Sequence, residues 1–144
     1  MAGRTCLTTT RVRFADTDAA GIVFYPNFYV WFDVGTHALL RAAGGALGDA
    51  EGRPRWPLPI VESGARFSAP LVLDDEITIR STVVSVGTRS LRVEHVISRG
   101  EREVASGFET RVFIRRQGAQ IVAEPIPAEL RDALNEPVST EGWA

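Results

Sequence analysis

The sequence predicts a two-layer α+β domain in which one long helix covers an antiparallel sheet. Two observations carry this prediction: a single long amphipathic helical pattern follows Pro26, and a series of strand-like segments with alternating apolar residues follows Leu58. A sheet with one apolar face must bury that face against another element. The helical segment has a wide apolar stripe, so we expect it to lie across the sheet.

The composition indicates one domain over residues 1–144 and argues against several classes of function. Hydrophobic residues make up 44% of the chain, which suits a globular protein with a sizeable core. The formal net charge of −2 argues against bulk electrostatic binding of nucleic acid. One cysteine and two histidines argue against an intrachain disulfide framework and against a Cys/His zinc site.

The chain also lacks sequence signals for a membrane or for secretion. No run approaches the roughly 18 apolar residues of a membrane span. The N-terminus does not have the charged and then apolar order of a secretory signal. We therefore expect no membrane association and a cytoplasmic location.

The first strand is expected over residues 8–14, and the long helix over residues 26–43. The helix is indicated by one apolar stripe at about 100° per residue. The stripe comprises Phe28, Trp31, Phe32, Gly35, Leu39 and Ala42. Pro26 suits the first helical turn, where its missing N–H costs nothing, and Gly44 suits the C-terminal cap.

A surface loop is expected over residues 44–57, because glycine, proline and charged residues are mixed there. Strands with alternating apolar residues come next. They are predicted over residues 58–67, 76–86, 91–98 and 104–114, with a shorter segment over residues 120–123. In the last long strand the apolar face is expected to carry Val104, Phe108, Val112 and Ile114. A short terminal helix is expected over residues 127–134.

The segment between the first strand and the helix has the most informative chemistry. Asp16 and Asp18 lie two residues apart, just before Gly21 and the proline that starts the helix. An acid near a helix N-terminus combines a nucleophile or base with N–H donors for a developing oxyanion. This pairing points to acyl transfer. A metal site at the Asp-x-Asp pair is not favoured, because no third ligand is apparent nearby.

The run Asp-Thr-Asp-Ala-Ala-Gly-Ile-Val-Phe-Tyr-Pro-Asn-Phe over residues 16–28 resembles the hotdog-fold acyl-CoA thioesterases, and most closely their 4-hydroxybenzoyl-CoA thioesterase branch. The resemblance extends from Arg11 to about Pro127 through strand order and through short runs at residues 59–61, 74–75 and 89–91. It implies a hotdog fold, in which an antiparallel sheet wraps around one long central helix. It also implies a homodimer or homotetramer with active sites at the subunit interface.

The resemblance assigns the catalytic roles to the loop and the helix start. Asp18 matches the family's catalytic carboxylate, which attacks the thioester carbonyl or deprotonates a water that does so. Tyr25 matches the position whose backbone N–H polarises the thioester oxygen. From local sequence alone, Asp18 can also be a loop or capping aspartate, and the Tyr25 ring an aromatic staple at the helix entry. Gly21 is expected to allow a tight turn or a close approach to the substrate.

Asp33 and Arg89 are the expected contacts to the two ends of the substrate. Asp33 matches an aspartate that borders the acyl pocket and can accept a hydrogen bond from a ring hydroxyl. Arg89 matches a basic position of the nucleotide-binding loop, where a guanidinium can grip a CoA phosphate. Gly87 and Thr88 replace two basic positions of the family example, so Arg92 is an alternative phosphate ligand.

Several residues also have a simpler interpretation. Asp33 and His37 lie opposite the apolar stripe, so in an isolated domain both would face solvent. Arg89 can likewise be an ordinary surface arginine. For Asp16 we favour a structural role, in which its side chain orders the loop through backbone N–H groups.

These features together predict a thioesterase that hydrolyses an aromatic acyl-CoA of benzoyl or hydroxybenzoyl type. The alternatives are a thioesterase for short-chain aliphatic acyl-CoA and a non-catalytic acyl-CoA binding protein. An acyl-thioester dehydratase of the same fold is disfavoured, because those enzymes typically have a histidine at the helix start. No metal and no cofactor are expected, since coenzyme A is part of the substrate.

Overall fold

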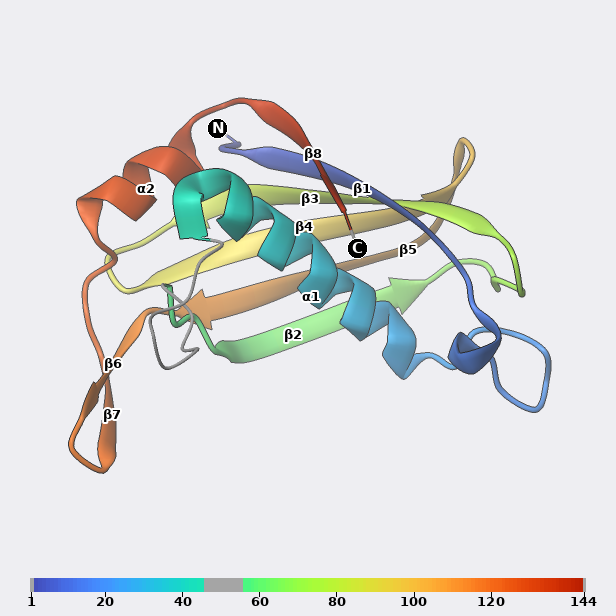
Figure 1. Cartoon of the computed structure of the whole chain (residues 1–144), viewed down its shortest axis with the longest axis horizontal. Coiled ribbons are helices and arrows are strands. Elements are labelled where there is room, and N and C mark those ends of the chain that lie inside the picture. The colour runs from blue at the N-terminus through green and yellow to red at the C-terminus, as the bar shows by residue number, and fades with distance from the viewer. Residues whose placement is uncertain (1, 46–55, 144) are drawn as a thin grey trace.

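The computed structural model describes residues 2–45 and 56–143, and within them a six-stranded sheet is crossed by one long helix (Figure 1). The strands of the sheet are β1 (Thr5–Arg11), β2 (Ile60–Phe67), β3 (Glu76–Val86), β4 (Ser90–Arg99), β5 (Arg102–Val112) and β8 (Ser139–Trp143). Their order is β2-β5-β4-β3-β1-β8. All neighbours pair antiparallel except β1 and β8, which run parallel.

The long helix α1 (Pro26–Leu40) lies diagonally across one face of the sheet (Figure 1). Its buried residues are Phe28, Trp31, Phe32, Gly35, Thr36, Ala38, Leu39 and Leu40. The predicted stripe is therefore confirmed up to Leu39, and Pro26 stands in the first turn as expected. The buried apolar side chains of α1 and of the sheet form the core, as the α+β prediction requires.

The prediction for Ala42 is wrong, because Ala42 is exposed and Ala43 is buried instead. The helix passes into a π-helical turn over Arg41–Gly45, η2. A π turn has a longer repeat than an α-helix, so the apolar face moves on by one residue. Gly44 has φ 85° and ends the helix in the left-handed conformation. The loop expected over residues 44–57 falls largely on residues 46–55, which lie outside the described residues.

The first strand lies earlier than predicted. It covers Thr5–Arg11 rather than residues 8–14, and Phe14–Asp16 form a short 3₁₀ turn, η1. The turn is stabilised by the Asp16 carboxylate, which accepts the Arg13 N–H at 2.8 Å. The backbone therefore turns away from the sheet shortly after Arg11.

The C-terminal third differs from the prediction in two places. The strand expected over residues 104–114 ends at Val112, and Ile114 begins β6 (Ile114–Gln117), which pairs with β7 (Gln120–Ala123) as a separate hairpin. The terminal helix α2 (Ala128–Asn135) is present, and its Leu130 and Leu134 are buried. Strand β8 was not predicted. It pairs with β1, and the paired residues are 134 positions apart in the sequence.

The alternation predicted along the last long strand is also wrong. The pairing of β4 with β5 shifts register between Ile97 and Ser98, and both Val104 and Ala105 are buried. Beyond this irregularity the buried positions of β5 are Glu109 and Arg111, while Phe108 is only partly buried. Two charged residues therefore occupy positions on this strand that are removed from solvent.

The expected arrangement of one long helix against a mostly antiparallel sheet is confirmed, and it is the hotdog arrangement. No helix in the part of the chain that the structure describes is long and apolar enough to cross a membrane.

Candidate active site

The loop from residue 16 to residue 25 is folded into a tight hairpin. Thr17 and Val23 form a β-bridge, and the Asp18 N–H donates to the Ile22 carbonyl at 2.9 Å. Gly21 has φ 80°, which a residue with a side chain rarely adopts, and an added Cβ would meet no atom within 4 Å. Glycine is needed here for the turn itself and not for packing within this chain.

The Asp18 side chain is exposed at the tip of this hairpin. One carboxylate oxygen, Oδ1, accepts the Ala20 N–H at 2.8 Å, which fixes the orientation of the carboxylate. Among the described residues no group donates to Oδ2, so this oxygen remains open to solvent or to a substrate. Asp18 is therefore a loop aspartate that orders its own turn and does not cap α1, whose N-cap Tyr25 has no side-chain cap hydrogen bond.

Asp16 makes backbone contacts and organises the hairpin. Its side chain accepts the Arg13 N–H, and its carbonyl accepts both the Phe24 N–H at 2.9 Å and the Asn27 side chain at 2.8 Å. These contacts tie the loop to the first turn of α1. They are the kind of contact through which we expected Asp16 to order the loop.

Tyr25 occupies the N-cap of α1 and is 61% exposed. No acceptor in residues 2–45 or 56–143 takes up its backbone N–H. Its ring makes edge contacts with Phe24 and with Phe67 at the end of β2. A donor at the positive end of the helix dipole is thus available for a negatively charged oxygen.

A hollow of about 370 Å³ lies beside the start of α1. It is lined mainly by apolar residues from the hairpin, the helix and the segment after β2: Ile22, Val23, Tyr25, Phe28, Phe67, Ser68, Ala69, Pro70 and Leu71. Asp18 is not among the lining residues, although Ile22 at the end of its hairpin is. Within one chain, Tyr25 therefore belongs to the hollow, whereas the carboxylate of Asp18 faces solvent.

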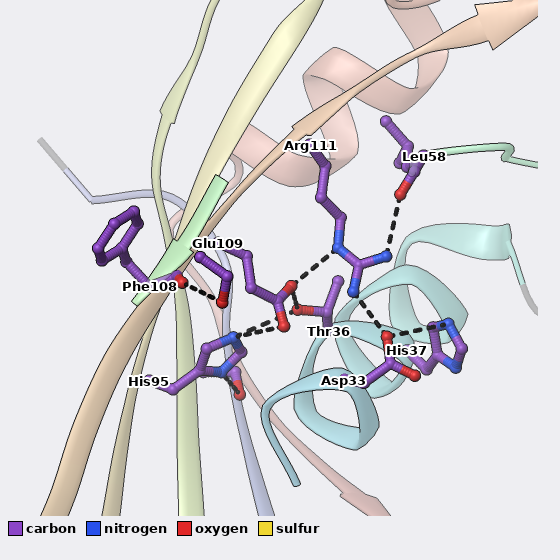
Figure 2. Close-up of polar contacts among 10 residues, drawn as sticks. Asp33, Thr36, His37, Leu58, His95, Phe108, Glu109 and Arg111 are labelled. Atoms are coloured by element: carbon purple, nitrogen blue, oxygen red, sulfur yellow. Dashed lines mark hydrogen bonds and ion pairs between the residues drawn. The ribbon is translucent and has the colours of Figure 1, made fainter. Parts of the chain in front are cut away.

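Asp33 faces solvent only in part, because it is also tied to the sheet. Its Oδ1 accepts a hydrogen bond from Arg111 Nη2 at 2.7 Å, and its side chain remains 46% exposed (Figure 2). His37 is exposed, and its Nε2 lies 3.9 Å from the same oxygen. Asp33 is therefore the outer end of a polar network that continues into the core.

The network runs from α1 to the middle of the sheet. Glu109 Oε2 accepts hydrogen bonds from Arg111 Nε at 2.8 Å and from the Thr36 hydroxyl at 2.7 Å. On the other side, His95 Nε2 lies 3.4 Å from Glu109 Oε1, and His95 Nδ1 lies 2.7 Å from Ser81 Oγ. Figure 2 shows these side chains converging between the helix and β5.

The contacts within the network keep its buried charged side chains ionised. Burial by itself would raise the pKa of Glu109, but the hydrogen bonds from His95 and Arg111 outweigh it and lower the pKa from 4.5 to about 2. Burial likewise opposes the charge of Arg111, whose pKa is nevertheless raised by Glu109 and Asp33. Glu109 and Arg111 are therefore an ionised pair at neutral pH.

Ser81, His95 and Glu109 contact one another in the same succession as the serine, histidine and acid of a serine hydrolase triad. They are nevertheless not a catalytic triad. Each residue is at most 1% exposed, so a substrate cannot reach Ser81 Oγ. The imidazole is also stacked on Phe32, with ring centroids 4.9 Å apart. We interpret these three residues as structural.

Arg89 lies far from the hairpin of Asp18 in the same chain. The end of β1 pairs with the start of β3, and Arg89 follows the other end of β3. An 11-residue strand spans roughly 33 Å, so the two residues lie at opposite ends of the sheet. Arg89 is exposed, and its turn is fixed by Arg131, whose Nη2 donates to the carbonyls of Gly87 at 2.6 Å and Thr88 at 3.3 Å.

Arg92, the alternative phosphate ligand, lies on β4 with its guanidinium over the Phe108 ring, 4.0 Å from the centroid. It also contacts Glu94 at 3.4 Å. The structure thus brings Tyr25 and the hairpin of Asp18 to one end of the sheet, and it leaves Arg89 at the other.

Sequence analysis did not predict that five polar residues form one cluster: Thr36, Ser81, His95, Glu109 and Arg111. One signal was present, because Glu109 and Arg111 are two residues apart in a strand and so point to the same side. The side to which they point depends on the register shift, which the sequence does not show.

A long helix that lies across a mostly antiparallel sheet is the arrangement of the hotdog-fold thioesterases. The chain belongs to the thioesterase-like superfamily, whose family model matches residues 12–134. Its relatives are named thioesterases and CoA hydrolases, and the protein is a thioester hydrolase.

Two curated relatives illustrate the similarity. The 4-hydroxybenzoyl-CoA thioesterase of Pseudomonas sp. (strain CBS-3) is 28% identical over 134 residues, covering 83% of this chain and 89% of the relative. A 1,4-dihydroxy-2-naphthoyl-CoA hydrolase of Synechococcus sp. (strain CC9902) is 31% identical over 123 residues, covering 82% and 83%.

Solved structures agree with this assignment. A gentisyl-coenzyme A thioesterase is 38% identical and superposes with a TM-score of 0.75, covering 89% of this chain and 98% of its own. A mutant of 4-hydroxybenzoyl CoA thioesterase complexed with 4-hydroxybenzoyl CoA is 27% identical, with a TM-score of 0.81 and coverage of 92% and 99%.

Proposed function

We propose that this protein hydrolyses the thioester of a hydroxylated aromatic acyl-CoA to the free acid and coenzyme A, with Asp18 as the reacting carboxylate. The names of the relatives support the substrate class, because hydroxybenzoyl, gentisyl and dihydroxynaphthoyl groups are all aromatic rings with hydroxyl groups. The observation that carries the proposal is that one loop holds an oriented, exposed carboxylate at residue 18 and leads to the N–H of Tyr25 at the start of α1, which no described residue accepts.

In the proposed reaction the Tyr25 N–H donates to the thioester oxygen, which becomes negatively charged as the carbonyl carbon is attacked. Asp18 supplies the attacking group in one of two ways. Its carboxylate bonds to the carbon and forms a mixed anhydride that water then hydrolyses, or it removes a proton from a water that attacks directly. In both routes the carbon–sulfur bond breaks and the thiolate of coenzyme A leaves. The reaction uses no further cofactor.

The proposal includes a second subunit. Within one chain, Asp18 and Arg89 lie at opposite ends of the sheet. A single substrate therefore contacts both groups more readily when they come from two different subunits. The surface around the hollow is unusually apolar for an exposed region. Its exposed residues include Ile22, Phe24, Tyr25, Phe67, Val72 and Leu73. A homodimer, or a homotetramer of two dimers, would cover this surface and complete the site, and sedimentation equilibrium measures this directly.

Thiol release from acyl-CoA substrates tests the function. The Asp18→Asn variant is expected to lose about 10²-fold or more in kcat on 4-hydroxybenzoyl-CoA, because the amide is neither nucleophile nor base. The matched control is Asp132→Asn, which changes an exposed aspartate on α2 and should keep full activity. A loss below threefold for Asp18→Asn would show that another group performs the attack.

Two further outcomes would redirect the assignment. Faster turnover of aliphatic acyl-CoA than of benzoyl-type substrates would place the enzyme with the short-chain thioesterases. Tight binding of acyl-CoA by the wild type without thiol release would make the protein a non-catalytic acyl-CoA binder.

A further inference from the structure

Strand β8 covers an edge of the sheet that would otherwise be open (Figure 1). On one side β1 pairs with β3 along its whole length, and on the other it pairs with β8 over residues 5–9. Without β8, the N–H and C=O groups on that side of β1 would have no partner in the sheet. β8 also lies outside residues 12–134, the part that the family model matches, so this cover is not part of what that model describes.

The covered edge has the composition of a strand that pairs readily. Residues 5–10 are Thr-Cys-Leu-Thr-Thr-Thr, a run without proline, glycine or charge in which four of the six side chains are β-branched. Short segments with high β-propensity and low charge pair with strands of other molecules when their edge is exposed. Arg11, the charged residue of β1, lies beyond the part that β8 covers.

β8 also packs closely against the helix and the sheet. A Cβ added to Gly142 would lie 2.6 Å from Ala38 Cβ on α1 and 2.9 Å from Cys6 Sγ on β1. Only glycine therefore lets the strand approach both elements this closely. Cys6 is 0% exposed and Ala38 is 3% exposed. β8 thus shields two core side chains in addition to the backbone edge.

Arg41, which follows directly after α1, fixes the end of β8. Its Nη2 donates to the Trp143 carbonyl at 2.9 Å, and its guanidinium carbon lies 4.4 Å from the centroid of the Trp143 ring. The hydrogen bond and the cation–π contact together tie the strand to the helix. β8 has five residues, and a strand this short offers little length for another chain to pair with.

The opposite edge of the sheet is β2, and within the described residues no strand covers it. β2 has eight residues and none of them is buried; Ile60, Val61 and Phe67 are between 45% and 62% exposed. An edge that pairs with its own copy about a twofold axis is fully occupied in the dimer. A sheet with one open edge therefore closes as a dimer, whereas a sheet with two open edges can continue to add copies.

We infer that β8 is a cover that keeps a second pairing edge of this chain, β1, closed to other copies of the same chain. It thereby confines pairing between copies to β2, and assembly ends in a closed oligomer. The inference rests on the homodimer of the proposed function only for the pairing at β2. The covering of β1 follows from contacts within one chain.

Cys6 is the only cysteine of the sequence and reports whether β8 is in place. A chain that ends at Glu136 lacks β8 but keeps α2 and the ion pair between Glu136 and Arg4 at 3.0 Å. We expect its Cys6 to react with dithionitrobenzoate about tenfold faster than in the wild type, because the thiol is no longer covered. In sedimentation velocity the truncated chain should form larger species that grow with protein concentration, and the wild type should not.

A peptide of residues 137–144 separates loss of the cover from a general loss of stability. Added in excess to the truncated chain, it should occupy the β1 edge, slow the reaction of Cys6 again and return the species to the size of the wild type. A peptide with the same residues in scrambled order is the control and should do neither. Arg41→Ala in the full chain should accelerate the reaction of Cys6 by a smaller factor, because it removes only the contacts to Trp143.

Two results would overturn the inference. One is a truncated chain that is folded by circular dichroism and sediments like the wild type at every concentration. The other is a Cys6 that reacts as slowly without β8 as with it. If the truncated chain does not fold, Gly142→Val in the full chain decides by the same two measurements, because the added side chain does not fit between Ala38 and Cys6. Neither measurement depends on hydrolysis, so failure of the inference and failure of the proposed function are distinguished.

Discussion

His95 Nε2 lies 3.4 Å from Glu109 Oε1, with each residue only 1% exposed to solvent. Arg111 and Thr36 bind the other oxygen of the same carboxylate. The core between α1 and β5 is thus built around a charged group whose partners come from the helix and from two strands. Burying a charge in this way is tolerated only while every partner is present, so the cluster ties the helix to one position on the sheet.

The first prediction concerns pH. The pKa of Glu109 is about 2 in the folded protein and 4.5 ordinarily, so the unfolded state binds the proton more readily. The resulting stability is fully present above pH 4.5 and is lost as pH falls toward 2, on the order of 3 kcal/mol. Urea unfolding at pH 7, 5 and 3 measures it. Glu109→Gln should show a flatter dependence in this window, and parallel curves for the two proteins would contradict the prediction.

The second prediction concerns the helix side of the cluster. Thr36→Val keeps the shape of the side chain but removes the hydroxyl that donates to Glu109 at 2.7 Å. We expect a loss of about 1–3 kcal/mol in the free energy of unfolding, because a buried carboxylate loses a donor. Thr9→Val, at an exposed position of β1, is the control and should stay within about 0.5 kcal/mol of the wild type. Equal effects at both positions would show that the hydroxyl of Thr36 does not stabilise Glu109.

The third prediction concerns the turn that carries Arg89. Arg131 binds the carbonyls of Gly87 and Thr88, so Arg131→Ala should loosen this turn. If Arg89 binds a CoA phosphate, as the family resemblance implies, KM should rise severalfold and the fall in kcat should be smaller. Arg89→Ala should raise KM in the same way, and the effect should weaken at high salt. Arg80→Ala, at an exposed position of β3, is the control. An unchanged KM in both variants would remove the nucleotide site from this turn.

The fourth prediction concerns the contact between helix and sheet. A Cβ at Gly35 would lie 2.0 Å from Ser81 Oγ, and that oxygen is held by His95. Gly35→Ala should therefore destabilise the protein by about 1–3 kcal/mol, although alanine favours helix more than glycine does. Adding Ser81→Ala removes the clashing oxygen and should recover part of this loss. Thermal unfolding of the three proteins tests the prediction, and a more stable Gly35→Ala would contradict it.

The sequence predicted the fold where the signal is local. The stripe from Phe28 to Leu39 alternates with the period of an α-helix, and Pro26 and Gly44 mark its ends through the backbone geometry that each residue favours. The acidic loop was identified for the same reason, since Asp18, Gly21 and Tyr25 are close together in the chain. In these segments neighbouring residues decide the conformation.

The prediction failed where the outcome depends on distant partners. Strand β8 is held in the sheet by β1, from the other end of the chain. Because of a π turn, Ala43 is buried in place of Ala42. Because of a register shift between β4 and β5, Glu109 and Arg111 face the interior. A shift of one residue exchanges the two sides of a strand, and composition does not reveal where it occurs.

The sequence by itself determined the two-layer fold and the loop that carries a carboxylate ahead of a helix, because both follow from short-range periodicity and turn chemistry. Only the tertiary structure decided that Asp33 is anchored by Arg111, since their positions are 78 residues apart and meet only when α1 packs on β5. Buried charges are stable only beside their partners, and packing alone brings those partners together.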